Sequence, residues 1–338
     1  MSECIFGDVT PTSSDRDGNG GVERWTRLAP SPTGALHLGN ARTFLVNFAL
    51  ARQHGWHVLM RIEDLDGPRV KPEASQQAIR VMEWMGMEWD AGPVFQSHEI
   101  DRYAEAMGVL VSNRSAYPCA LTRTQILDAL HAPHVDSREI RFPPELRPTE
   151  FPERFNDPDT GWRFVTPDEV IEFEDLFAGE QRIRVSDSVG DFVIWTKQGM
   201  PAYQLAVVVD DARQGITDVV RGDDLLDSAA RQRLVYDALG FDNWPAQCHL
   251  PLVVGEDGRR LAKRHGDTRI ARYMEAGIPS ERVIGLMASW CGIGSEEPGA
   301  RGPRREMGIH EFVERFNLGR MSQEPLTCTR EDEAWLSE

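Results

Sequence analysis

The stretch RLAPSPTGALHLGNART, residues 27–43, packs two prolines, two glycines and a histidine around the start of an apolar helical pattern. From residue 41 onward, apolar side chains recur with the period of a helix that buries one face: Ala41, Phe44, Leu45, Phe48 and Ala49. Gly39 leaves the start of this helix open to a closely approaching group, and His37 stands at its mouth. Because a helix N-terminus presents unpaired N–H groups and a partial positive charge, the stretch predicts a site for an anion such as phosphate. The alternative is a Pro/Gly loop that enters an ordinary helix.

The segments on either side of this helix predict the fold class. Residues 57–63, HVLMRIE, form a short apolar run after a turn at Gly55, as expected of a buried strand. A strand, turn, helix and strand in this order predict a βαβ unit, a parallel sheet and hence an α/β fold. Later segments predict two more helices, 73–87 and 99–112, and two more buried strands, 202–211 and 248–255.

Three groups of polar residues are expected to meet at one edge of this sheet. In an open parallel sheet, ligands sit beyond the carboxyl ends of the strands. That rule places the 30–40 turn beside the residues that end the 57–63 strand and the loop GEDGRRLAKRHGD, residues 255–267. His37 from the turn and Lys263 from the loop are thereby predicted to converge on one phosphate group.

Size and composition indicate a globular protein with a real core. The chain has 338 residues, 41% of them hydrophobic, and no apolar run of 18 or more residues that would span a membrane. Residues 1–22 lack the layout of a secretory signal and are expected to form a disordered tail. The five cysteines are scattered without paired spacing, which predicts reduced thiols and a cytoplasmic protein.

The charge distribution leaves two interpretations open. The net charge is −17, whereas a nucleic-acid binder usually shows a basic footprint. Residues 259–272 reverse this locally, with six basic side chains opposed by Asp267 alone. This run is either a local nucleic-acid contact or a solvated charged face.

Composition also predicts the domain boundaries. Residues 131–160 are rich in proline and charge, and are expected to form an irregular excursion within an inserted module at about 113–200. We expect a catalytic domain over 23–294, followed by a linker and a short C-terminal segment over 295–338.

Five ordered motifs carry a resemblance to a known family. PSPTGALHLGN resembles the HIGH signature of class I aminoacyl-tRNA synthetases, and RLAKR at 260–264 resembles their KMSKS loop. RLAPSPTG, RIEDLD, AYQLAVVVDD, DVVRGDDLL and LAKRHGD are similar, in order and spacing, to the glutamyl-tRNA synthetase group. The likeness covers roughly residues 24–294. It implies a Rossmann-like parallel-sheet catalytic domain with an inserted α/β module.

Within this group the chain resembles a branch that modifies a tRNA base. Only 75 residues follow Lys263, fewer than a helical anticodon-binding domain would take, and IEDLDGPRVKPEA resembles that branch. The resemblance implies a monomeric ligase that activates L-glutamate with ATP and transfers it to the queuosine base in the anticodon loop of tRNA(Asp). Two alternatives stay open: a truncated enzyme that charges a tRNA 3′ end, and a non-catalytic regulatory protein that binds glutamate or adenylate.

The same resemblance implies the roles of individual residues. His37 and Lys263 would be catalytic at the triphosphate, where cationic groups stabilise transition-state charge. The ATP site would comprise Pro30, His37, Gly39, Asn40 and Lys263. The glutamate site would comprise Arg27, Ala29, Ser31, Glu63, Tyr203 and Arg221, since a dicarboxylate with an ammonium group calls for arginines and an acid. Ordinary surface ion pairs, Arg221 with a nearby aspartate and Glu63 with Arg61, are the alternative.

Two positions depart from the family pattern. The KMSKS-like loop has Arg260 and Ala262 where lysine and serine are frequent. In the inserted module, Cys119 is followed by Leu121 where the zinc-binding pattern has a second cysteine. One thiolate cannot hold a structural zinc ion, which needs four ligands, so we expect no zinc. Mg²⁺ would arrive with the nucleotide.

Overall fold

The predicted βαβ unit is present. The computed structural model describes residues 23–32, 35–65, 72–129, 140–259, 261 and 268–337. In it, β1 and β2 pair in parallel, with Trp25 opposite His57 and Leu28 opposite Met60, and α1 connects them. A second crossover, through α2, adds β3 in parallel to β2. The bounds are β1 Trp25–Leu28, α1 Leu38–His54, β2 His57–Ile62, α2 Pro72–Trp84 and β3 Ala91–Phe95.

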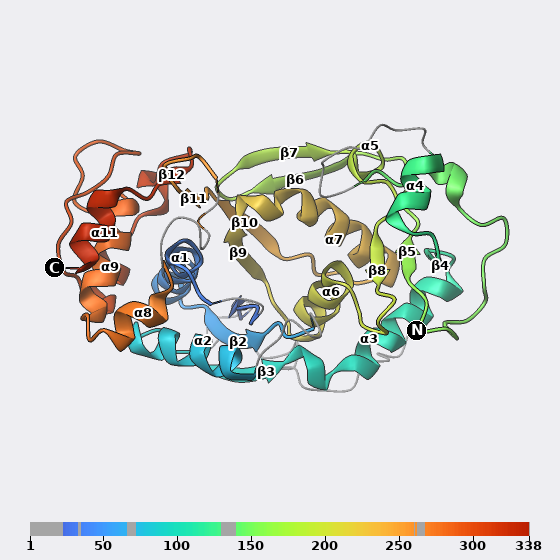
Figure 1. Ribbon diagram of the computed structural model, residues 1–338, viewed down its shortest axis with the longest axis horizontal. Coiled ribbons are helices and arrows are strands. Elements are labelled where there is room, and N and C mark those ends of the chain that lie inside the picture. Colours follow the sequence, from blue (N-terminus) through green and yellow to red (C-terminus); the bar gives the residue numbers. More distant parts are fainter. Residues whose placement is uncertain are drawn as a thin grey trace.

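A second group of strands continues the architecture beside β1. Its order is β7-β6-β10-β9, in which β10 is parallel to both of its neighbours and β7 is antiparallel to β6. The Thr217 amide donates to the Trp25 carbonyl (2.9 Å), so the start of β9 lies against β1 and the two groups meet there (Figure 1). The bounds are β6 Ile171–Asp175, β7 Gly179–Ile183, β9 Asp218–Gly222, α7 Leu226–Leu239 and β10 Ala246–Leu250.

The two further strands predicted from apolar runs need correction. Residues 202–211 were expected to form a buried strand but belong to helix α6, Tyr203–Arg213. Nearly every residue of this helix is buried, and a helix buried on all sides shows no periodicity that would distinguish it from a strand. The run 248–255 is divided: β10 ends at Leu250, before Pro251, and β11 (Val253–Val254) pairs with β12 (Leu326–Thr327).

The inserted segment forms a lobe that shares its hydrophobic core with helices α6 and α7. Its three strands form an antiparallel sheet in the order β4-β5-β8. Trp162 of β5 and Trp195 of β8 are buried in the core beneath this sheet. Residues 131–139, part of the predicted irregular excursion, lie outside the described residues; residues 140–160 contain only a short 3-10 turn at Pro144–Leu146 as regular helix or strand. The bounds are η2 Gln96–His98, α3 Ile100–Ser112, β4 Ala116–Pro118, α4 Arg123–Ala129, β5 Trp162–Phe164, α5 Val185–Ser188 and β8 Val193–Trp195.

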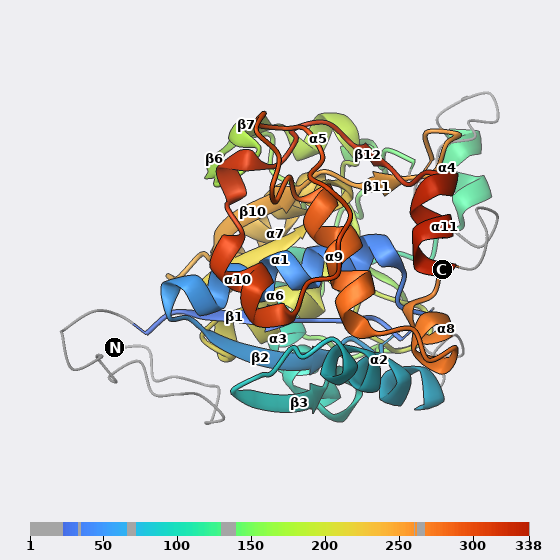
Figure 2. The ribbon, with the colours of Figure 1, turned by 90° about the vertical axis from the view of Figure 1, so that its left-hand side faces the viewer.

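The last part of the chain packs against the first crossover. Phe312 and Leu336 are fully buried in the same core as Leu45 of α1, and α9 lies between α10 and α11 in Figure 2. The boundary at residue 294 stays a prediction; in the structure, residues on both sides of it share this core. The bounds are α8 Ile270–Glu275, α9 Ser280–Trp290, α10 Ile309–Arg315, η6 Leu318–Arg320 and α11 Arg330–Ser337, with η4 Asp223–Leu225 earlier in the chain.

Candidate active site

A cavity of about 440 Å³ opens at the edge of the sheet where β1, β2 and β9 end. The predicted site residues that the structure describes all line it: Arg27, Ala29, Pro30, Ser31, His37, Gly39, Asn40, Glu63, Tyr203 and Arg221. Lys263, with Arg260 and Ala262, lies outside the described residues. Four segments far apart in the sequence thus contribute to a single cavity.

The start of α1 forms one wall of this cavity. His37 caps the helix in an extended conformation, and the first turn of α1 contains no acidic residue to offset its partial positive charge. A Cβ atom on Gly39 would lie 3.3 Å from the Cβ of Val253, so the glycine also allows α1 to pack closely against β11. This wall can accept an anionic group.

The segment that follows the basic loop is fixed against the same helix start. The Leu38 amide donates to the Thr268 carbonyl (3.2 Å), and the Ile270 amide donates to the Leu36 carbonyl (2.9 Å). These two bonds flank His37, which pairs with Arg269 in a β-bridge. The chain therefore emerges from residues 262–267 directly beside the predicted phosphate site.

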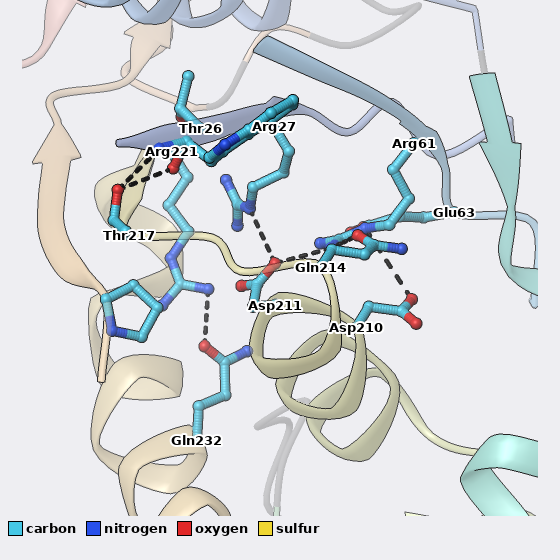
Figure 3. A network of polar contacts seen from close by, with 12 residues as sticks. Thr26, Arg27, Arg61, Glu63, Asp210, Asp211, Gln214, Thr217, Arg221 and Gln232 are labelled. Atoms are coloured by element: carbon cyan, nitrogen blue, oxygen red, sulfur yellow. Dashed lines mark hydrogen bonds and ion pairs between the residues drawn. The ribbon is translucent and has the colours of Figure 1, made fainter. Parts of the chain in front are cut away.

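A buried layer of charge lies behind Arg27 and Glu63, which line the cavity. Arg27 of β1 and Arg61 of β2 both donate to the same oxygen of Asp211, over 3.2 Å and 2.7 Å respectively (Figure 3). Arg61 also donates to Glu63 (3.1 Å) and to Gln214 (2.9 Å). The pairing of Glu63 with Arg61 that the alternative interpretation expects is therefore present, but the two side chains are 11% and 0% exposed, so it is not a surface ion pair.

The two carboxyl groups of this layer differ in how well their charge is compensated. Burial alone would raise the pKa of Asp211, but attraction to Arg61 and Arg27 outweighs it and the pKa lies below its ordinary value. Burial dominates at Glu63, with repulsion from Asp211 as a smaller contribution, and its pKa is raised although Arg61 and Arg27 oppose the rise. Glu63 lines the cavity, so a cation arriving there would favour its ionised form.

Arg221 lies among neutral groups. Its guanidinium donates to His249 Nε2 (2.9 Å), Gln232 Oε1 (2.8 Å) and Gln247 Oε1 (3.2 Å). Burial lowers its pKa. Among the described residues no carboxylate lies within ion-pair distance of this side chain, so the positive charge is available to an anionic ligand.

Sequence reasoning missed three residues that support this site. Asp211 belongs to a motif that the resemblance used, but the segment was interpreted as a strand and its contact with Arg27 and Arg61 was not foreseen. His249 and Asp175 lie behind Arg221, and the one available signal was a histidine inside an otherwise apolar strand pattern. The contacts of His249 and Asp175 depend on the strand register, and those of Asp211 depend on how α6 packs against the sheet; a local sequence pattern gives neither.

Two further properties of the described residues concern metal binding and membranes. They contain no group of three or more histidine, cysteine or acidic side chains placed to hold a metal ion. Cys119, Cys248, Cys291 and Cys328 are free and buried. Within the same part of the chain, no helix has the length and apolar character required to cross a membrane.

Comparison with known proteins agrees with this geometry. The family model of the class I tRNA synthetases (E and Q), catalytic domain, matches residues 24–331. The chain is 41% identical to a glutamyl-Q tRNA(Asp) synthetase of Rhodopirellula baltica, over 88% of this chain and 94% of the relative. It is 42% identical to a protein of the same name from Symbiobacterium thermophilum, over 92% and 98%.

More distant relatives extend beyond the matched region. A glutamate–tRNA ligase of Dechloromonas aromatica is 37% identical over 93% of this chain but only 66% of its own length. The crystal structure of a glutamate tRNA ligase from Elizabethkingia meningosepticum in complex with its amino acid superposes with a TM-score of 0.75 at 26% identity, covering 93% of this chain and 68% of that one. Fold, site geometry and sequence identity agree: the chain belongs to the class I tRNA synthetases (E and Q), a family of ligases.

Proposed function

We propose that this protein activates L-glutamate with ATP and transfers the glutamate to the queuosine base in the anticodon loop of tRNA(Asp). Relatives that are 38–42% identical over most of the chain bear the name of this activity. The match covers 94% and 98% of the first two of these relatives, against 66% of the glutamate–tRNA ligase. These comparisons favour base modification over the charging of a tRNA 3′ end.

The observation that carries the amino-acid assignment is the neutral surroundings of Arg221. A buried guanidinium with only neutral partners favours a ligand that brings its own negative charge. Glutamate supplies a carboxylate, whereas glutamine would place a neutral amide there and leave the charge uncompensated. Arg27 lies in the same cavity, and Glu63 offers a carboxylate to the ammonium group of the ligand.

The start of α1 is proposed to bind the phosphates of ATP. An oxygen of the glutamate α-carboxylate attacks the α-phosphorus, the bond to the bridging oxygen breaks, and pyrophosphate leaves. His37, Asn40 and the N-terminus of α1 would face the developing negative charge, with Pro30 and Gly39 shaping the wall and Lys263 approaching from its loop. Mg²⁺ would be held chiefly by the nucleotide phosphates.

The tRNA is proposed to approach from the side of the basic run. Arg259, Arg269 and Arg272 belong to this run and are among the described residues. Bases of a single-stranded loop can be splayed into a protein cavity, while phosphates are held by arginines. We further propose that the protein works as a monomer in the cytoplasm, where ATP and tRNA are available; light scattering on the purified protein checks the first point.

Glutamate-dependent exchange of pyrophosphate into ATP tests the first half-reaction. The expected result is exchange with glutamate but not with glutamine, in the absence of any tRNA. Saturable glutamate binding without exchange would instead identify a non-catalytic binding module. Exchange that requires tRNA would contradict activation as proposed.

A further inference from the structure

We propose that Asp175 and His249 are positioning residues, which fix Arg221 in the geometry that receives the glutamate carboxylate. This inference rests on the proposed function. The three side chains come from adjacent parallel strands: Asp175 ends β6, His249 lies in β10 and Arg221 lies in β9. His249 and Arg221 are directly opposite in the β10–β9 register. Asp175 and His249 have fully buried side chains, and no contact with a substrate is assigned to them.

The hydrogen bonds assign one tautomer to the His249 ring. A guanidinium can only donate, so the 2.9 Å contact from Arg221 Nε makes His249 Nε2 an acceptor. The proton must then reside on Nδ1, which lies 2.6 Å from Asp175 Oδ2 and donates to it. The carbonyl of Leu225 also lies near the ring and could accept a bond from the opposite tautomer. The Asp175 contact therefore selects between two orientations of donor and acceptor.

Asp175 is itself held by the backbone. Its other oxygen, Oδ1, accepts from the amides of Phe177 (3.0 Å), Ala178 (2.8 Å) and His249 (3.0 Å). Three amide donors fix which oxygen faces the backbone and which faces the imidazole ring. Oδ2 is therefore fixed as the acceptor that faces the imidazole ring. This acceptor determines the tautomer of His249, and hence whether Nε2 can accept from Arg221.

This arrangement makes a specific prediction for Asp175→Asn, a change of almost no volume. The three amides keep the remaining carbonyl oxygen at the Oδ1 position, so the new NH₂ group takes the Oδ2 position and faces His249 Nδ1. That group can only donate, which forces the ring proton onto Nε2. The Nε2–H then opposes the N–H of Arg221, and the arginine loses its acceptor.

Steady-state exchange kinetics distinguish positioning from mere structural support. In Asp175→Asn and His249→Leu, the KM for glutamate is expected to rise about tenfold or more, the scale of one lost hydrogen bond to a charged group, while the KM for ATP stays within about twofold. His249→Gln can place an amide oxygen near the former Nε2 position and is expected to recover most of the loss. Unchanged glutamate KM in the first two variants, or equal increases for glutamate and ATP, would overturn the proposal.

Asp191→Asn is the matched control. Asp191 is also a buried carboxylate held by hydrogen bonds, from Tyr117, Arg147 and the Thr166 amide, but it lies in the inserted lobe. Its substitution is expected to lower the melting temperature and to leave the glutamate KM unchanged. A similar rise in glutamate KM in this control would show that general destabilisation, not positioning, causes the effect.

A measurement on the wild-type protein keeps the proposal testable if a variant fails to fold. Long-range ¹H–¹⁵N spectra of ¹⁵N-histidine-labelled protein report which ring nitrogen of His249 carries the proton. Nδ1–H is expected, and Nε2–H would overturn the proposal. Absence of glutamate-dependent exchange in the wild type would instead contradict the proposed function, so the two failures are distinguishable.

Discussion

Arg61 and Asp211 form a buried ion pair, with 2.7 Å between Nη1 and Oδ1, that joins the end of β2 to helix α6. Asp211 binds Arg27 through the same oxygen, so the pair also aligns one of the arginines of the cavity. The site is thus supported by ion pairs between residues that are far apart in the sequence and come together only in the folded chain.

Removing one member of this pair should be costly. Arg61→Leu leaves Asp211 and Glu63 without their shared cation, and we expect a loss of about 3–5 kcal/mol in the free energy of unfolding. Urea denaturation measures the loss. Arg184→Leu is the control: it breaks an exposed pair with Asp168 and should change stability little. Equal effects in both variants would show that the buried pair has no special role.

The two residues that we propose to act at the triphosphate, His37 and Lys263, should affect chemistry rather than amino-acid binding. His37→Ala and Lys263→Ala are each expected to raise the barrier to adenylate formation by about 2.7–4 kcal/mol, as for other donors aimed at transition-state charge. Glutamate affinity should change little, because Arg27, Glu63 and Arg221 are untouched. Single-turnover adenylation and glutamate titration separate the two quantities; a normal adenylation rate would remove these residues from the mechanism.

Glutamate binding should release protons because the pKa of Glu63 is raised in the free protein. Burial disfavours the charged form of the Glu63 carboxyl group. The ammonium group of the bound glutamate stabilises that charged form, so ligand binding lowers the pKa of Glu63 and releases a proton. Affinity should therefore rise as pH increases through the raised pKa of Glu63, above the ordinary value of about 4.3. Calorimetry in two buffers of different ionisation enthalpy measures the release, and Glu63→Gln should abolish it. Proton uptake on glutamate binding would contradict this prediction.

The packing of the C-terminal region can be tested with two glycines. A Cβ atom at Gly285, within α9, would collide with the carbonyl oxygen of Arg305, whereas Gly108, within α3, has open space around it. Alanine normally stabilises a helix interior by about 1 kcal/mol relative to glycine. We expect that gain for Gly108→Ala and a net loss for Gly285→Ala in thermal unfolding. A gain in both would mean that Arg305 is not fixed against α9.

Local pattern was sufficient for the first crossover and insufficient for α6. The helix after Gly39 has a helical period, and the strand after Gly55 is a short apolar run that follows a turn; the structure agrees with both predictions to within a few residues. Eight of the eleven residues of Tyr203–Arg213 are buried, so its apolar run shows no single apolar face and the pattern predicts a strand.

In the site, too, local sequence predicts some residues and not others. The family resemblance implied the residues that line the cavity, because each lies within a recognisable local motif. The partners behind them escaped prediction, since the contact of His249 with Arg221 exists only through the register of β10 against β9. Register is a property of the assembled sheet, and a single strand sequence does not contain it.

The central claim concerns where the glutamate goes, and transfer of labelled glutamate tests it most directly. The decisive substrate is tRNA(Asp) that carries queuosine but ends in an adenosine without 2′ and 3′ hydroxyl groups. The same tRNA without queuosine, and an intact tRNA(Glu), serve as comparisons. We predict stable labelling of the first RNA, confined to its anticodon loop, and none of the other two. Labelling that requires the terminal ribose hydroxyls, or that proceeds equally on tRNA(Glu), would show that the protein charges a tRNA 3′ end.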